Sequence, residues 1–65
     1  MFSIRVQTVV QGWVVSREGA DEPLSTHRTQ ADAEAAGRAA ARIEGAVYEL
    51  HDHEGRLRVR TYPQL

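Results

Sequence analysis

Hydrophobic and polar residues alternate along two stretches near the start of the chain. From Phe2 to Val10 every second residue is apolar or threonine, and the alternation resumes from Trp13 to Glu18 after Gln11-Gly12. A period of two is typical of a half-buried strand. Glycine in a short connection accepts the positive φ of a tight turn. These two stretches therefore predict a β-hairpin.

A second pair of alternating stretches lies near the other end of the chain. Val47 to Asp52 and Arg56 to Tyr62 are separated by Asp52-His53-Glu54-Gly55, which predicts a four-residue turn. In the last stretch, alternation directs three side chains toward the core: Leu57, Val59 and Thr61. It directs the other four outward: Arg56, Arg58, Arg60 and Tyr62.

Between the two pairs lies an alanine-rich segment, Thr29 to Gly45, that predicts a helix. Thr29 is a suitable N-cap with Asp32 three residues later, and Gly45 is a suitable stop. Gly37 stands in the helix interior, where glycine costs about 1 kcal/mol relative to alanine. We attribute Gly37 to a close approach of the helix to the sheet.

The order of these elements predicts an α+β fold of the ββαββ type. We expect residues 1–65 to form one domain, with an antiparallel sheet of four strands and the helix packed on one face. Leu24 to Arg28 is an optional fifth strand at an edge. The predicted core consists of the alanine face of the helix together with Ile4, Val6, Trp13, Val15, Ile43, Tyr48, Leu50, Leu57 and Val59.

Composition limits the ligands and partners that the protein is expected to have, but it indicates no activity. The chain has no cysteine, so it has neither disulfides nor thiolate ligands for a metal. The formal net charge is −1, which gives no overall attraction to nucleic acid or to an anionic membrane. No apolar segment approaches the roughly 18 residues of a membrane span, and no signal peptide is visible. We expect a cytoplasmic protein without a cofactor or a membrane partner.

An ordered set of short motifs resembles a known family. The set begins with Gly12-Trp13-x-Val15-x-x-Glu18-Gly19 and continues with Ser25-x-His27-x-Thr29 before the helix. It ends with Gly45 and His51-x-x-x-Gly55-Arg56-Leu57. Together these motifs resemble the small bacterial family called domain of unknown function 2188, over roughly Ile4 to Tyr62. The resemblance implies a ββαββ domain and carries no established activity.

Two groups of residues invite a catalytic or metal-binding interpretation. His51-Asp52-His53-Glu54 is the densest cluster of titratable groups, and His51 beside Glu49 or Asp52 has the composition of a general base. Ser25 and His27 contain a nucleophile type and a base type, but nothing in the sequence places one against the other. We interpret the cluster as a polar turn without a metal and expect no enzyme activity.

The arginines near the end of the chain are the main candidate for binding. All eight basic residues other than histidine are arginine, and alternation places Arg56, Arg58 and Arg60 on one strand face with Tyr62. Arg5 on the first strand is a candidate neighbour. Such a face suits phosphate or carboxylate groups, so nucleic acid and an acidic protein are both open as partners. The alternative is a solvated face on which Glu18 and Glu49 neutralise the arginines.

The outward apolar residues suggest another role. Val9, Val14 and Val47 point away from the helix if the alternation holds, and one helix covers only one face of a sheet. An open face or edge of this kind often pairs with a second copy, so we expect a homodimer. The sequence therefore predicts a small non-catalytic interaction module that self-associates through its sheet. The alternative is a nucleic-acid-binding module that uses the arginine-bearing face.

Overall fold

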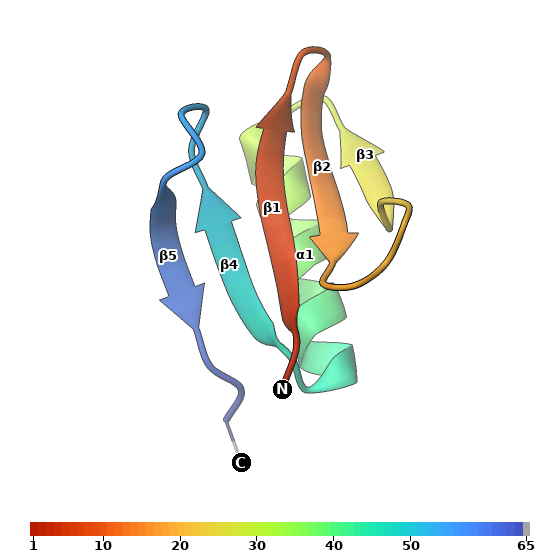
Figure 1. Cartoon of the computed structure of the whole chain (residues 1–65), viewed down its shortest axis with the longest axis vertical. Coiled ribbons are helices and arrows are strands. Elements are labelled where there is room, and N and C mark those ends of the chain that lie inside the picture. The colour runs from red at the N-terminus through yellow and green to blue at the C-terminus, as the bar shows by residue number, and fades with distance from the viewer. Residues whose placement is uncertain (65) are drawn as a thin grey trace.

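The computed structural model describes residues 1–64 and contains one helix and one sheet (Figure 1). This confirms the α+β prediction with the helix on one face. The optional edge strand is present, so the sheet has five strands. The elements in chain order are β1 (Ser3–Val9), β2 (Gly12–Arg17), β3 (Ser25–His27), α1 (Gln30–Glu44), β4 (Val47–His51) and β5 (Leu57–Thr61).

The strands lie in the order β3-β2-β1-β4-β5. Three neighbouring pairs are antiparallel, as expected, but β1 and β4 run parallel. The sheet is therefore mixed rather than antiparallel. The physical reason is the crossover: α1 runs back along the sheet, so the chain enters β4 from the end at which β1 begins. This topology puts β1 at the centre of the sheet and β5 at an edge (Figure 1).

The helix ends where the sequence predicts. The hydroxyl of Thr29 accepts a hydrogen bond from the backbone N–H of Asp32 at 3.2 Å, and Gly45 closes the helix with φ 65°. Gly37 lies against the sheet: a Cβ added there would be 2.7 Å from Val6 Cγ2 and 3.0 Å from Tyr48 Cε1. The predicted close approach is confirmed. Within the part of the chain that the structure describes, no helix is long and apolar enough to cross a membrane.

The core lies between α1 and the strands at the centre of the sheet. Its largest fully buried side chains are Ile4, Val6 and Val15. Tyr48 and Leu50 of β4 are also buried, as predicted, and Trp13 packs against the edge of the cluster while partly exposed. The helix contributes small residues, so the core depends on close helix–sheet contact rather than on large helical side chains.

Three predicted core residues lie outside the core. Ile43 is 83% exposed, because at 100° per residue it lies about 120° around the helix from Gly37, which faces the sheet. Leu57 and Val59 are 40% and 37% exposed. Val59 is exposed because α1 packs on the other four strands and does not contact β5. Leu57 is exposed because the register shift after Leu50 places it opposite His51, on the face away from the helix.

Candidate binding surface

The sheet face opposite the helix carries a row of three charged residues. Arg5 of β1 is the register partner of Glu49 in β4, and Glu49 is also the partner of Arg60 in β5. Directly opposite residues share a face and lie within reach of each other. The tertiary structure thus brings Arg5 and Arg60 to the two sides of one carboxylate.

Glu49 is the centre of this row and is almost fully buried, with its side chain 8% exposed. Arg60 Nε donates to Glu49 Oε2 at 3.1 Å, and Arg5 Nε lies 3.5 Å from Oε1. His51 Nε2 forms a hydrogen bond with Oε1 at 3.2 Å, and the hydroxyl of Ser3 donates to Oε2 at 3.5 Å. Glu49 therefore links β1, β4 and β5 through side chains.

Opposing effects set the pKa of Glu49. Burial raises the pKa, because the charged form loses solvent. The hydrogen bonds from His51 and Arg60, with the positive charges of Arg60 and Arg5, lower it more, so the pKa lies below its ordinary value. The Tyr62 side chain and then the Glu49 carboxylate raise the pKa of Arg60. The charged forms of Glu49 and Arg60 therefore stabilise each other.

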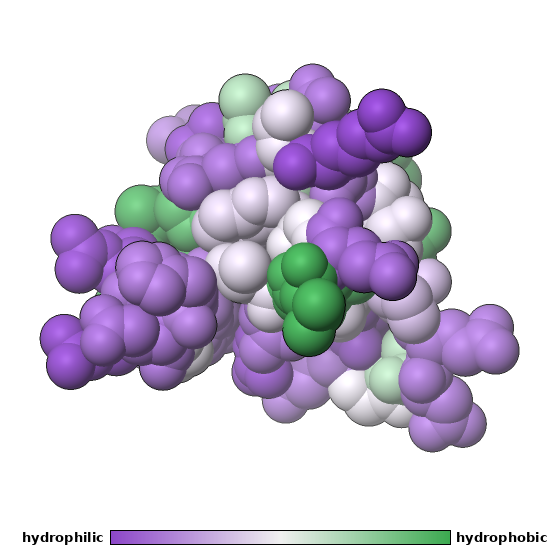
Figure 2. Space-filling model, turned by 90° about the horizontal axis from the view of Figure 1, so that it is seen from above, coloured by the Kyte–Doolittle hydropathy of each residue, from purple (hydrophilic) through white to green (hydrophobic). Residues whose placement is uncertain are grey.

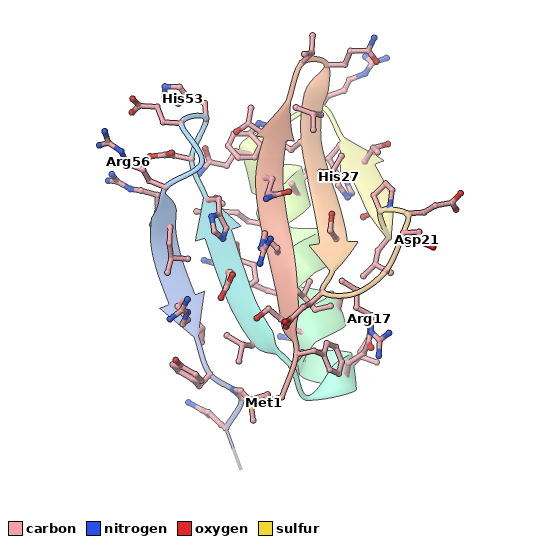
Figure 3. All side chains as sticks on the ribbon, viewed as in Figure 1. Met1, Arg17, Asp21, His27, His53 and Arg56 are labelled. Atoms are coloured by element: carbon pink, nitrogen blue, oxygen red, sulfur yellow. The ribbon has the colours of Figure 1, made fainter. Side chains whose placement is uncertain are left out.

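Arg56 and Arg58 are directed elsewhere. A register shift between Leu50 and His51 interrupts the β4–β5 pairing, so that His51 lies opposite Leu57. Arg58 Nη1 lies 3.9 Å from Asp52 Oδ2, and Arg56, which precedes β5, lies at the tip of the hairpin (Figure 3). The predicted row of three arginines on one strand is therefore divided, because the bulge breaks the alternation of β5.

The four arginines in and around β5 and the Glu49 row are all partly or strongly exposed, although they do not share one face. The side chains of Arg5, Arg60, Arg58 and Arg56 are 42%, 45%, 64% and 71% exposed. Glu49 is 8% exposed, and Asp52, the partner of Arg58, is 20% exposed. A partner that approaches therefore meets Arg5 and Arg60 before the buried Glu49, and Arg58 before Asp52. At Arg56 the neighbouring carboxylate of Glu54 is itself 56% exposed. We call Arg5, Arg56, Arg58, Arg60 and Tyr62 the arginine surface.

Tyr62 is the one strongly exposed aromatic side chain of the arginine surface. It is 62% exposed and follows β5 directly. The other aromatic residues of the described chain lie on the helix side of the sheet or at the edge of the core: Phe2, Trp13 and Tyr48. The arginine surface therefore offers one ring for stacking, whereas platforms for single-stranded nucleic acid stack successive bases on several.

The turn between β4 and β5 uses its polar groups to hold its own backbone. Asp52 Oδ1 accepts hydrogen bonds from the backbone N–H groups of Arg56 and Glu54, both at 2.9 Å. These bonds, that of Arg56 first, lower the pKa of Asp52. Gly55 has φ 81°, which suits the predicted turn. Within residues 1–64 no group of three or more histidine or acidic side chains is placed to hold a metal ion.

Ser25 and His27 form a contact that the sequence analysis missed. Ser25 Oγ lies 2.8 Å from His27 Nε2, since residues two apart on β3 share a face. The period-two pattern was the signal that could have found it. In the described chain no carboxylate hydrogen-bonds to His27, so the third group that orients the base in a catalytic triad is missing. His27 also lies at the edge of the sheet opposite the β4–β5 turn (Figure 3).

The outward valines do not form one patch. Val9 is opposite Gly12 at one end of the β1–β2 pair, whereas Val47 is opposite Ser3 at the other end of β1. Val47 is also buried, which leaves Val9 and Val14 as the accessible apolar residues of the three. At the end of the molecule with the hairpin turns, the surface is mostly hydrophilic with scattered hydrophobic residues (Figure 2).

Comparison with known proteins gives a family and no activity. A family model described as an uncharacterized protein conserved in bacteria (DUF2188) matches residues 7–61. The matched span runs from Gln7 in β1 to the last residue of β5 and includes Glu49 and three of the arginines of the arginine surface, Arg56, Arg58 and Arg60. No curated protein and no solved structure matches the chain.

Proposed function

We propose that this chain, which belongs to the uncharacterized bacterial family DUF2188, is a non-catalytic interaction module that binds an acidic protein segment on its arginine surface. One observation carries the proposal: the side chains of Arg5 and Arg60 are almost half exposed, while Glu49 between them is buried. A carboxylate-rich partner gains charge-assisted hydrogen bonds from such a surface without displacing Glu49. A cytoplasmic setting, in which the protein meets such partners, is part of the proposal.

The state of Glu49 supports binding over catalysis. A general base works best with a pKa near the working pH. The basic groups around Glu49 lower its pKa instead, and they occupy both carboxylate oxygens. Glu49 therefore acts as a fixed anion that holds Arg5 and Arg60 in place.

An acidic protein is favoured over nucleic acid by the distribution of aromatic residues. Tyr62 is the single exposed ring at the arginine surface. Guanidinium groups without several stacking rings recognise carboxylates as readily as phosphates. Nucleic acid remains the alternative function, and the experiment below distinguishes the two.

The test is a pair of NMR titrations at low salt, one with a hexaglutamate peptide and one with a mixed-sequence single-stranded oligonucleotide. We expect the peptide to shift backbone amides of residues 56–62 and of the neighbouring β4, and the shifts to fade as salt screens the charges. Arg58→Ala should weaken peptide binding about fivefold, since an exposed charge pair contributes at most about 1 kcal/mol.

Arg28→Ala is the matched control, because Arg28 is an exposed arginine next to β3 at the opposite edge. We expect it to leave peptide binding unchanged. Equal weakening by the two variants would mean that only net charge matters and would overturn the proposal. Tighter binding of the oligonucleotide at residues 56–62 would establish the nucleic-acid alternative instead.

Self-association through the sheet is a weaker candidate function, and the homodimer stays a prediction. Val14 is the accessible apolar residue nearest the middle of the open face, where it lies between Gln7 and Thr26. Sedimentation equilibrium of the wild type and of Val14→Asp tests this role. A dimer that Val14→Asp dissociates would make this face a self-association surface.

A further inference from the structure

We infer that the acidic partner binds as an extended strand added to the free edge of β5, with acidic residues at alternate positions. This inference rests on the proposed function and specifies how the same surface is used. It differs from a purely electrostatic contact across the sheet face, because it requires backbone hydrogen bonds between β5 and the partner.

The first observation is the open edge. β5 pairs with β4 on one side and with no other strand, and all five of its residues are exposed. An exposed edge strand presents unpaired backbone N–H and C=O groups to any extended chain. The opposite edge strand, β3, has three residues and contacts α1. The longer and less covered edge of the sheet is therefore β5.

The direction of the backbone groups follows from the pairing pattern. Val47 donates its N–H to the carbonyl of Phe2 at 3.1 Å, so alternate residues of β4, beginning with Val47, bond to β1. The residues between them, Tyr48 and Leu50, then bond to their β5 partners Thr61 and Val59. Within β5, the backbone N–H and C=O of Arg60 are left pointing to the free edge.

The side chains of β5 define the chemistry of the partner. On an added strand, residues opposite Arg60 share the outer face with its guanidinium, so acidic side chains are favoured there. Val59 points to the helix side, where α1 leaves β5 uncovered. Val59, Leu50 and Trp13 form the apolar part of a groove of about 610 Å³ between the β4–β5 turn and the start of α1. The other residues that line it are polar or charged and include Arg58 and Asp52. A small apolar residue of the partner fits opposite Val59, so the preferred sequence alternates acidic and apolar residues.

A second copy of β5 does not supply the acidic side chains that are favoured opposite Arg60. A two-fold axis pairs two β5 strands in an antiparallel arrangement. With the axis at Val59, Arg58 lies opposite Arg60; with the axis at Arg58 or at Arg60, that arginine lies opposite itself. An axis at Thr61 places no two arginines opposite each other, but it pairs only the end of the strand, since Pro63, which has no N–H, then lies opposite Val59. Like charges directly opposite each other destabilise a pair of strands. The arginines therefore disfavour self-pairing at this edge and favour an acidic strand.

The test uses a soluble octapeptide of alternating glutamate and valine, and the same peptide with N-methyl groups on alternate backbone amides. We expect the parent peptide to slow hydrogen exchange of the Arg60 amide at least tenfold on the complete chain. The amide of Val59, which already faces β4, is the internal control and should change little. N-methylation should weaken binding at least tenfold, because it removes donors without changing charge.

The outcomes separate this inference from the function on which it rests. If both peptides bind equally and Arg58→Ala weakens both, the arginine surface binds acidic chains by charge alone, and strand addition is wrong. If neither peptide binds and hexaglutamate also fails to bind, the proposed function fails as well. Slower exchange at Arg60 with the parent peptide, lost with the N-methylated one, is the result that supports strand addition.

Discussion

The strands under the helix and the edge strand β5 differ in what stabilises them. β1, β2 and β4 bury apolar side chains against α1, and Ile4, Val6 and Val15 are fully buried. β5 has the same alternating pattern, yet α1 does not contact it and none of its residues is buried. β5 is fixed by its backbone pairing with β4 and by the ion pair between Arg60 and Glu49.

Because of this difference, we assign folding mainly to β1, β2 and β4 and binding mainly to β5. A chain of this size has a marginal core, so the side chains of β1, β2 and β4 that face α1 are needed for folding. An edge strand that contributes little to the core is available to a partner. Its arginines also limit unwanted pairing with another copy, which is a common way for proteins to protect sheet edges.

The largest expected effect is the loss of a core side chain. Ile4→Ala should lower the free energy of unfolding by about 3 kcal/mol, because it removes a fully buried side chain and leaves a cavity. Val59→Ala on β5 should lower it by less than about 1 kcal/mol, since Val59 is partly exposed already. Urea denaturation of both variants measures the contrast. Equal losses would show that β5 belongs to the core.

The next effect concerns Glu49, which joins the two regions. Glu49→Gln should lower the free energy of unfolding by about 1.5 kcal/mol at pH 7, the low end for hydrogen bonds to a charged group, because its arginine partners are half exposed. The pKa of Glu49 is lower in the folded state than in the unfolded state. Its contribution is therefore complete above the ordinary glutamate pKa of about 4.3 and lost as the pH falls through the folded value.

Urea denaturation from pH 7 to pH 3 checks this dependence. The difference between wild type and Glu49→Gln should be present at pH 7 and should shrink in the acid range. Glu54→Gln is the matched control, since Glu54 is exposed and lies 4.0 Å from Arg56. We expect it to change stability by less than about 0.5 kcal/mol. A difference for Glu49→Gln that persists at pH 3 would refute the role assigned to its charge.

The smallest effect tests how closely the helix lies on the core strands. Gly37→Ala should lower the free energy of unfolding by about 1 kcal/mol, because the added methyl group meets Val6 and Tyr48 and outweighs the gain in helix propensity. The opposite exchange at an exposed helical position, Ala35→Gly, should also destabilise by about 1 kcal/mol, through propensity alone. Thermal unfolding followed by circular dichroism measures both. A stabilised Gly37→Ala variant would mean that the helix has room to move.

Local signals in the sequence determined the elements and much of the core. Thr29, Gly45 and Gly55 mark a cap, a stop and a turn because each of these needs a particular backbone or side-chain group within a few residues. Alternation correctly assigned Ile4 and Leu50 to the buried side. These features depend on neighbours along the chain, so they can be read without knowledge of the fold.

Only the tertiary structure decided which strands are neighbours and where the helix lies. The parallel pairing of β1 and β4 joins segments more than 40 residues apart and places Glu49 between Arg5 and Arg60. The same strand order moves β5 beyond the helix, which is why Val59 is exposed although its pattern predicted burial. The bulge in the β4–β5 pairing places Leu57 opposite His51, on the open face. Alternation defines two sides of a strand, but burial depends on what covers each side, and long-range packing sets that.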